Sequence, residues 1–372
     1  MRLSHAVCSL LPLLASVLAT GCKKPEKQAA ETQTVQSVPV PEATAAAVKG
    51  PSADELTLPT LPPVPIPADN PMTEAKVKLG HQLFFDKRLS VDGSRACYSC
   101  HLNEDGTGGH DPTAIGPKNK ALPRHSPVLW NVAYLPKLYW DGRSDSLEAQ
   151  GTAAWAGGNM GVGKENLEAK AKEIGKIAGY KKQFKEVFGS PDPTPANIVA
   201  ALSAYERTII CDNTAYDKYA KGDKSALNDS QKRGLELFMG KAACATCHTP
   251  PHFSIAALGK DGAFFNTGMG TQDKKEEEID KGRMAVTQKD SDFAAFKPPM
   301  LRNVTKTAPY FHNGSQPVLK EAVRFMASGG YKNKNLTPLL ADRKLSDAEL
   351  DSIVSFLGAL ECPGKLEEPK LP

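Results

Sequence analysis

Apolar residues at helical spacing recur in two similar segments of the chain. The first is LGHQLFF at residues 79–85, which follows the N-cap candidate Thr73. The second is RGLELF at residues 233–238, which follows the N-cap candidate Ser230. Each pattern predicts a short amphipathic helix. Because the sequences that come after these two helices are also similar, a duplicated domain is the simplest explanation.

The same criterion predicts three further helices. Residues 319–326 form one, and residues 346–360 form another, with a serine cap and acidic residues in its first turn. Long connections rich in Gly and Pro separate the helices, and few alternating strand patterns are visible, so we expect a mostly α fold with long functional loops. The remaining helix, residues 195–210, places four apolar side chains on one face: Ile198, Leu202, Tyr205 and Ile209.

The N-terminus has the features of an export signal. Arg2 precedes an apolar run over residues 6–18, and small residues at 19–21 lead directly to Cys22. This pattern predicts a signal peptide over residues 1–21 and a location in the periplasm. A cysteine directly after such a site resembles a lipobox, which predicts a diacylated Cys22 and a membrane-anchored lipoprotein. Ala19 stands where leucine is usual, and an ordinary secreted signal with a chance cysteine is the alternative.

Residues 22–70 are rich in Pro, Ala, Thr and charged residues, which predicts a disordered tether. No later stretch is apolar enough to span a bilayer, so the lipid on Cys22 is the only membrane contact that we expect. The 372 residues exceed one ordinary domain and favour two. Lysines are spread along the chain, which carries a formal net charge of +4, so a nucleic-acid partner is not expected.

Two Cys-x-x-Cys-His motifs carry the chemistry of the sequence. The spacing allows two thiols about one helical turn apart to add to the vinyl groups of haem, and it places the histidine to ligate the iron. Zinc sites and dithiol redox pairs also use Cys-x-x-Cys and are the alternatives. Two copies in an exported chain favour two covalently bound haem c groups. The motif residues are Cys97, Cys100 and His101 in the first copy, and Cys244, Cys247 and His248 in the second.

The second axial position of each haem iron decides between electron transfer and reaction with a small molecule. Methionine raises the potential and suits electron transfer, whereas an open position suits catalysis. Any one methionine is also a common filler of a hydrophobic core. The candidates after the second motif are Met269, Met284, Met300 and Met326.

From about Leu79 to Gly330 the chain resembles the bacterial dihaem cytochrome c peroxidase family, which includes the MauG-type enzymes. The resemblance implies two tandem cytochrome c-like helical haem domains, a peroxidatic one at residues 71–222 and an electron-transfer one at residues 223–372. Homodimerisation is a further implication. The segments that carry the resemblance are LGHQLFFDKRLS, HSPVLWNVAY, YWDGR, YERTI, FFNTGMG, DKGRMAVT, PPMLRNV, TAPYFHNGS and LKEAVRFMASGG.

The resemblance also assigns roles to single residues. The haem ligated by His101 corresponds to the peroxidatic haem, and the haem ligated by His248 to the high-potential one. Met326 matches the distal ligand of the second haem, where MauG-type enzymes have tyrosine. Trp140 matches a tryptophan between the haems that is thought to connect them electronically. A large core aromatic is the alternative interpretation of Trp140.

The sequence departs from the family at the first haem. A histidine that blocks the catalytic iron in well-studied members is replaced here by Pro117. We therefore expect an open or water-ligated first haem unless another residue such as His110 reaches it, and His110 is expected to be an exposed loop residue. Gln150 matches the family glutamine that orients peroxide, but Asn159 stands where the family has a glutamate. An amide cannot exchange a proton as a carboxylate does, and Glu165 is a candidate substitute.

A further departure concerns calcium. Thr307 and Pro309 match two positions at which family members bind calcium through backbone oxygens, but His125 appears where an asparagine ligand is expected. Imidazole is a poor ligand for a hard cation, so weak binding, binding through water and the absence of calcium all stay open. Cys211 and Cys362 lie outside the haem motifs, as either a structural disulfide or two unrelated thiols.

The leading hypothesis is an enzyme that reduces hydrogen peroxide to water with electrons from a small periplasmic cytochrome c or cupredoxin. The second hypothesis is a MauG-like enzyme that oxidises residues of a partner protein; the open first haem supports it, and Met326 weighs against it. The third is a non-catalytic dihaem electron carrier or sensor. The missing glutamate supports the third hypothesis, whereas two elaborate domains exceed what a carrier requires.

Overall fold

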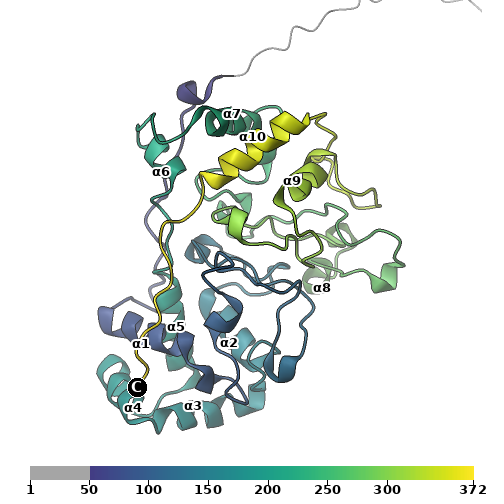
Figure 1. Ribbon diagram of the computed structural model, residues 1–372. Coiled ribbons are helices and arrows are strands. Elements are labelled where there is room, and N and C mark those ends of the chain that lie inside the picture. The colour runs from purple at the N-terminus through teal and green to yellow at the C-terminus, as the bar shows by residue number, and fades with distance from the viewer. Residues whose placement is uncertain (1–50) are drawn as a thin grey trace, which may run out of the picture. The chain divides into compact units, whose positions relative to one another are not determined.

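The computed structural model describes residues 51–372 (Figure 1). The predicted signal peptide, Cys22 and the first part of the predicted tether lie outside the described residues. Residues 51–372 belong to one compact unit. The described residues contain α-helices, short 3-10 turns and isolated β-bridges, and no strands, which confirms the prediction of a mostly α fold. Within this part of the chain, no helix is both long and apolar enough to cross a membrane.

The first hydrophobic core lies where α1 (Glu74–Phe85) crosses α5 (Pro195–Glu206). The crossing depends on Gly80, because a Cβ at this position would lie 1.8 Å from the backbone oxygen of Ala201. α2 (Leu147–Ala156) packs on α5, and α3 (Leu167–Gly175) and α4 (Ala178–Phe188) complete this half of the structure.

The second core repeats the arrangement of the first. α7 (Asp229–Met239) crosses α10 (Asp347–Gly358), and a Cβ on Gly234 would lie 2.0 Å from the backbone oxygen of Ser352. The glycine shared by LGHQLF and RGLELF is thus a close-packing residue in both halves. α6 (Ala215–Ala220), α8 (Met284–Thr287) and α9 (Leu319–Ala327) belong to the same half of the chain.

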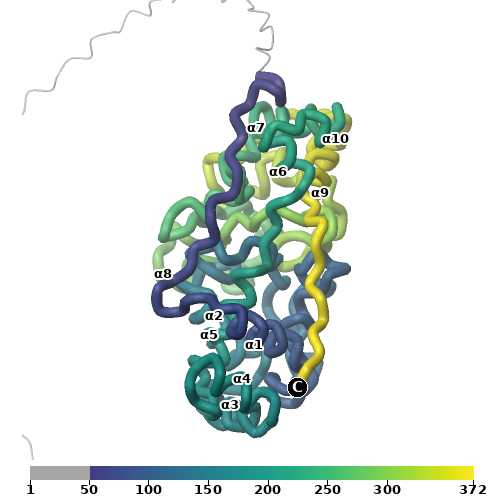
Figure 2. Tube along the Cα trace, turned by 90° about the vertical axis from the view of Figure 1, so that its left-hand side faces the viewer, coloured from purple at the N-terminus to yellow at the C-terminus, as the bar shows by residue number. Residues whose placement is uncertain are grey.

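The two cores do not divide the chain at residues 222 and 223. Tyr216 and Tyr219 of α6 are fully buried in the second core, so this core begins before the predicted boundary. The terminal segments also cross over: Ala53 packs in the second core and Leu366 in the first. Figure 2 shows the purple and the yellow segments each running lengthwise from the helices of the second core to those of the first.

The prediction of a disordered tether is wrong for residues 51–70, which hold fixed contacts. The backbone N–H of Ala53 donates to Glu236 (3.0 Å), and the Tyr134 hydroxyl donates to the backbone oxygen of Pro62 (2.8 Å). Composition misleads here because prolines have no N–H to satisfy, so an extended segment can be fixed by a few side-chain partners.

Helix positions follow the sequence pattern closely, with some corrections. The caps at Thr73 and Ser346 are confirmed, because each side chain accepts a backbone N–H of the first turn. The cap of α7 is Asn228 instead of Ser230, and α5 ends at Glu206 instead of residue 210. α2, α3, α4 and α6 were not predicted. The predicted alternative of a Cys211–Cys362 disulfide is confirmed, with the two Cα atoms 5.5 Å apart.

Candidate functional site

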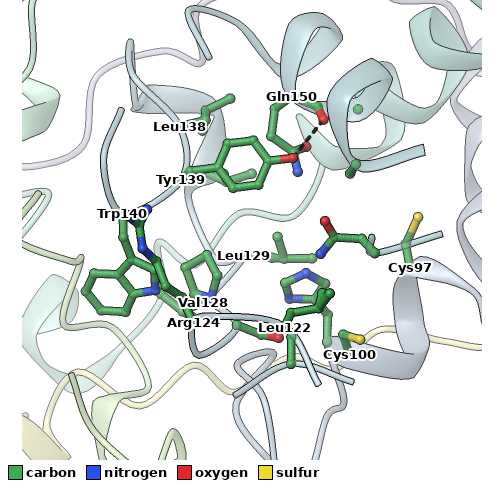
Figure 3. Close-up of a pocket in the computed structure, with 18 of the residues that line it drawn as sticks. Cys97, Cys100, Leu122, Arg124, Val128, Leu129, Leu138, Tyr139, Trp140 and Gln150 are labelled. Carbon is green, nitrogen blue, oxygen red and sulfur yellow. Dashed lines mark hydrogen bonds between the residues drawn. The ribbon is translucent and has the colours of Figure 1, made fainter. Parts of the chain in front are cut away.

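Residues of the first motif line a cavity of about 470 Å³ together with the residues that the family resemblance singles out. Cys97, Cys100 and His101 come from the segment after α1, and Gln150 comes from α2. Figure 3 shows Cys97 and Cys100 on one side of this cavity, with Gln150 and Trp140 at other parts of its wall. Residues that the sequence analysis singled out in separate segments therefore line one cavity in the structure.

The imidazole of His101 is held in a defined orientation. Its Nδ1 lies 2.9 Å from the backbone oxygen of Thr107, so Nδ1–H donates there and Nε2 remains available as a ligand. Burial lowers the pKa of His101 to about 4, which keeps the ring neutral. A neutral, oriented imidazole fits the role of an axial ligand to haem iron.

The second motif lines a separate cavity of about 210 Å³. His248 Nδ1 lies 3.1 Å from the backbone oxygens of both Phe253 and Pro299, which again leaves Nε2 available. Burial lowers the pKa of His248. Cys244 and Cys247 line the same cavity. Each motif thus has a cavity that contains its two thiols and its histidine.

The four motif cysteines carry free thiols, and burial raises the pKa of each. For Cys244 the pKa is raised to about 12. A reactive dithiol has a lowered thiol pKa, so the dithiol alternative does not fit these cysteines. Across residues 51–372, no three His, Cys, Asp or Glu side chains converge as a metal site. Paired thiols at the wall of a cavity fit thioether attachment of haem.

The candidate methionines separate by position. Met326, on α9, and Met269 line the second cavity, whereas Met300 lines the first and Met284 lines neither. The sulfur of Met269 lies 3.2 Å from the hydroxyl of Ser315, from which it accepts a hydrogen bond. Met326 therefore lies in the same cavity as His248 and carries no such bond.

Trp140 lies between the two sites, because its side chain lines both cavities. The indole N–H donates to the backbone oxygen of His125 at 2.8 Å, and the backbone oxygen of Trp140 accepts from Lys297 at 2.8 Å. Lys297 also lines both cavities, and burial lowers its pKa to about 8. The position of Trp140 fits a residue between two haems.

The loop that lacks the family histidine does not enter the first cavity. Pro117 lines neither cavity, and a Cβ on Gly116 would lie 2.2 Å from the backbone oxygen of Gly158, so this loop packs closely against the segment after α2. His110 is exposed and lines neither cavity; its hydrogen bond with Asp105 raises its pKa. His101 and His125 are the histidines that line the first cavity among the described residues.

Asn159 lines the first cavity, as the family comparison predicts for this position. Glu165 does not: it is exposed, lines neither cavity and accepts a hydrogen bond from Asn166. The prediction that Glu165 could replace the family glutamate is therefore wrong. Its carboxylate belongs to the loop before α3, which turns toward solvent.

The donor set at the predicted calcium position does not fit a calcium ion held through His125. The Nδ1–H of His125 donates to the backbone oxygen of Asp111 at 2.9 Å, and the other ring nitrogen, Nε2, is buried without a partner. A nitrogen donor is unsuited to a cation that prefers oxygen. Thr307 and Pro309 match the family positions through their backbone oxygens, and the Thr307 hydroxyl already donates to the backbone oxygen of Val304 at 3.3 Å.

Glu206 and Tyr139 line the first cavity, and the sequence predicted no role for either of them. Glu206 ends α5, and its Oε2 is buried without a hydrogen-bond partner; burial raises its pKa to about 8. Tyr139 directs its hydroxyl at the backbone oxygen of Gln150, at 3.4 Å (Figure 3). Glu206 follows Leu202 by four residues, so an acid on the apolar face of the helix was a detectable signal.

Most charged groups of the first cavity are already paired. Asp141 accepts from Arg124 (2.6 Å) and Arg143 (3.0 Å), and Arg124 also binds Asp280 (2.7 Å). Glu206 takes part in no ion pair within the described residues. Arginine and aspartate side chains at the wall of the cavity thus neutralise one another, whereas the carboxyl of Glu206 remains able to contact a ligand.

Known proteins resemble this chain over most of its length. The family pattern described as di-haem cytochrome c peroxidase matches residues 74–225. The cytochrome-c peroxidase IdrP1 of Denitromonas iodatirespirans is 38% identical over 341 residues, covering 84% of this chain and 89% of that protein. The methylamine utilization protein MauG of Methylorubrum extorquens is 34% identical over 312 residues, covering 83% and 85%. A solved MauG-like protein associated with microbial copper homeostasis superposes with a TM-score of 0.76 at 29% identity, covering 84% of this chain and 97% of that one.

Proposed function

The chain belongs to the di-haem cytochrome c peroxidase family that includes MauG, and from that premise we propose that it reduces hydrogen peroxide to water with electrons from a small exported donor protein. The observation that carries the proposal is the arrangement of the two cavities. Each contains a complete Cys-x-x-Cys-His motif, and Trp140 lines both. Two haem sites with a shared aromatic wall are what a two-electron reduction with stepwise electron supply requires.

The residues divide the work between the two sites. His248 and Met326 would hold the electron-receiving haem, and His101 would hold the haem of the peroxide site. Haem supplies the redox-active iron for this chemistry. Trp140 forms the proposed electron route between the sites, and the buried cationic side chain of Lys297 lies beside this route.

The first cavity is suited to a small polar oxidant. Gln150 offers an amide at its wall to orient peroxide, and Pro117, which replaces the blocking histidine of well-studied family members, does not line the cavity. We therefore propose that the site binds peroxide without prior reductive activation. Asn159 contributes an amide but no exchangeable acid, so another group must assist the protons of peroxide.

The second candidate function is MauG-like oxidation of residues in a partner protein. The likeness to a solved MauG-like protein at 29% identity favours it, as does the open first site. Met326 in the second cavity favours the peroxidase function instead, because methionine ligation raises the potential and suits acceptance of electrons from a donor.

The cellular setting is part of the same proposal. We propose export to the periplasm, a lipid anchor on Cys22 and a small cytochrome c or cupredoxin as donor. Homodimerisation and the pairing of one haem with each half of the chain belong to this proposal as well. The export signal and the thioether motifs support this setting, because haem c is attached outside the cytoplasm.

A steady-state assay of the holoprotein with peroxide and a reduced small cytochrome c tests the function. Rapid turnover supports the peroxidase proposal. Negligible turnover with a long-lived oxidised form supports the MauG-like alternative, and no reaction with peroxide supports the carrier or sensor hypothesis. Trp140→Phe is expected to lower turnover at least roughly tenfold, because phenylalanine lacks the larger and more easily oxidised indole. The matched control is Trp130→Phe, a tryptophan of the first core that lines neither cavity.

A further inference from the structure

Tyr139 places a weakly bound hydroxyl beside Gln150 in the first cavity. The hydroxyl donates to the backbone oxygen of Gln150 at 3.4 Å, which is long for an O–H···O hydrogen bond. Figure 3 shows this hydroxyl pointing at Gln150, away from Trp140. A bond this long is readily exchanged for one to a ligand in the cavity.

The ring of Tyr139 is held firmly even though its hydroxyl is not. The guanidinium carbon of Arg143 lies 3.4 Å from the ring centroid, and Arg143 is itself bound to Asp141 at 3.0 Å. The backbone of Tyr139 has a φ of +65°, in the left-handed region that aromatic residues rarely adopt. Strained backbone positions of this kind are concentrated at functional sites.

Two other donors at the wall of the cavity, Trp155 and Arg124, already bind protein oxygens. The Trp155 indole donates to the backbone oxygen of Leu89 at 2.9 Å, and Arg124 donates to Asp141 at 2.6 Å. Glu206 has no partner but lies near Cys97, on whose thiol its charge acts, and so belongs to the side of the cavity where haem is attached. The Tyr139 hydroxyl, bound only at 3.4 Å to the backbone oxygen of Gln150, lies beside the amide proposed to orient peroxide.

We propose that Tyr139 is a further catalytic residue, whose hydroxyl donates a hydrogen bond to peroxide in the first cavity where Asn159 has no acid to offer. This inference rests on the proposed function. In the reaction the O–O bond of hydrogen peroxide breaks, two electrons arrive from the donor protein, and two protons (H+) taken up from the buffered solvent complete two water molecules. The phenol polarises the departing oxygen and retains its own proton. Burial raises the pKa of Tyr139, so the hydroxyl remains a donor at neutral and mildly alkaline pH.

Cyanide binding to the oxidised holoprotein tests the hydroxyl without peroxide turnover. Cyanide is an anionic ligand of ferric haem, and a nearby donor stabilises it. Tyr139→Phe removes one oxygen atom and keeps the ring under Arg143. We expect the cyanide dissociation constant to rise roughly tenfold or more, the loss typical of a hydrogen bond to a charged group. Tyr134→Phe is the matched control. Tyr134 lines neither cavity, and its hydroxyl donates to the backbone oxygen of Pro62.

Peroxide kinetics then test whether the donor acts in catalysis. Tyr139→Phe is expected to lower kcat/KM for peroxide by roughly 100-fold, the low end of proton-transfer assistance. Adding Asn159→Glu to this variant is expected to restore much of the loss, because a carboxyl returns to the wall of the cavity. In the wild-type background, Asn159→Glu is expected to change kcat/KM for peroxide less, because the Tyr139 hydroxyl already donates a hydrogen bond to peroxide.

The outcomes separate this inference from the function on which it rests. A cyanide affinity within twofold of wild type in Tyr139→Phe overturns the role of the hydroxyl, whatever the peroxide rate. Equal losses in Tyr139→Phe and Tyr134→Phe also overturn it, since they would indicate a structural effect. Weakened cyanide binding in a protein that does not turn over peroxide supports the donor and refutes the peroxidase proposal. Intact haem content and Soret spectra establish that each variant is folded.

Discussion

The buried carboxyl of Glu206 makes the stability of the folded protein depend on pH. Burial raises its pKa from an ordinary 4.5 to about 8. Between these two values the folded state holds a proton that the unfolded state has released, so the free energy of unfolding falls as pH rises. The stabilisation is complete below pH 4.5 and is lost as pH rises through 8. Each pH unit inside this window costs about 1.36 kcal/mol at most, or about 4 kcal/mol between pH 5 and pH 8.

Glu206→Gln removes the titrating group and is expected to flatten this part of the pH profile. The amide also needs partners in the cavity, so the absolute stability at pH 5 can fall by about 1–3 kcal/mol. The slope with pH is therefore the informative quantity. Guanidinium unfolding of the holoprotein, followed by far-ultraviolet circular dichroism at pH 5, 6, 7 and 8, measures that slope.

Glu165→Gln is the matched control, because Glu165 is an exposed acid that lines neither cavity. We expect this variant to keep the wild-type dependence on pH. If Glu206→Gln unfolds with the same pH slope as the wild type and the control, then Glu206 is not protonated in the folded state at neutral pH. The assignment of Glu206 as a neutral, unpaired acid in the haem cavity would then be refuted.

Three further changes test other parts of the structure. Replacing Cys211 and Cys362 by alanine removes a link across 151 residues and is expected to lower the free energy of unfolding by about 2–5 kcal/mol, measured by denaturant titration. Asp217→Asn leaves the fully buried guanidinium of Arg302 without its bidentate partner and is expected to cost about 3–5 kcal/mol in the same assay; a loss below 1 kcal/mol would contradict this. Met326→Tyr is expected to lower the midpoint potential of the second haem by roughly 100 mV or more in spectroelectrochemical titration, whereas an unchanged potential would exclude Met326 as its ligand.

Periodicity in the sequence was enough to find the helices that build the two cores. α1 and α7 bury one apolar stripe each, so their patterns are clear, and the glycine that permits each close crossing lies within the repeated segment. The N-cap of α7 was misplaced by two residues because Asn228, Asp229 and Ser230 are all acceptable caps.

α2 carries no such stripe and could not be found in this way. α2 buries only Leu147 and Trp155 and is otherwise rich in small residues, because part of it lines the first cavity instead of a packed core. Gln150 was therefore located by its motif and not by its helix. The residue type at a position that faces a cavity is determined by contacts with the ligand. Hydrophobic periodicity therefore contains little information about such a position.

The candidate site shows the same division. Motif spacing identified both sets of haem-attachment residues, because those constraints are local in sequence. The partners of the first cavity come from distant segments: Tyr139 follows the first motif by 38 positions, and Glu206 lies at the end of α5. Whether such a side chain is free or already paired depends on contacts that only the folded chain defines. Glu165 and Glu206 are both acids after α2 in the sequence, yet only Glu206 reaches the cavity.

The arrangement of these residues separates electron supply from proton handling. Trp140 and Lys297 line both cavities, so a change at either one alters the surroundings of both haem sites. Tyr139 and Gln150 line only the first cavity, so they can act on a ligand there without affecting the second site. Substitutions at the residues that contact the oxidant can therefore change the reaction at the first site, while the residues between the two sites are retained. The loss of a carboxyl at Asn159 alongside an intact Trp140 is a change of this kind.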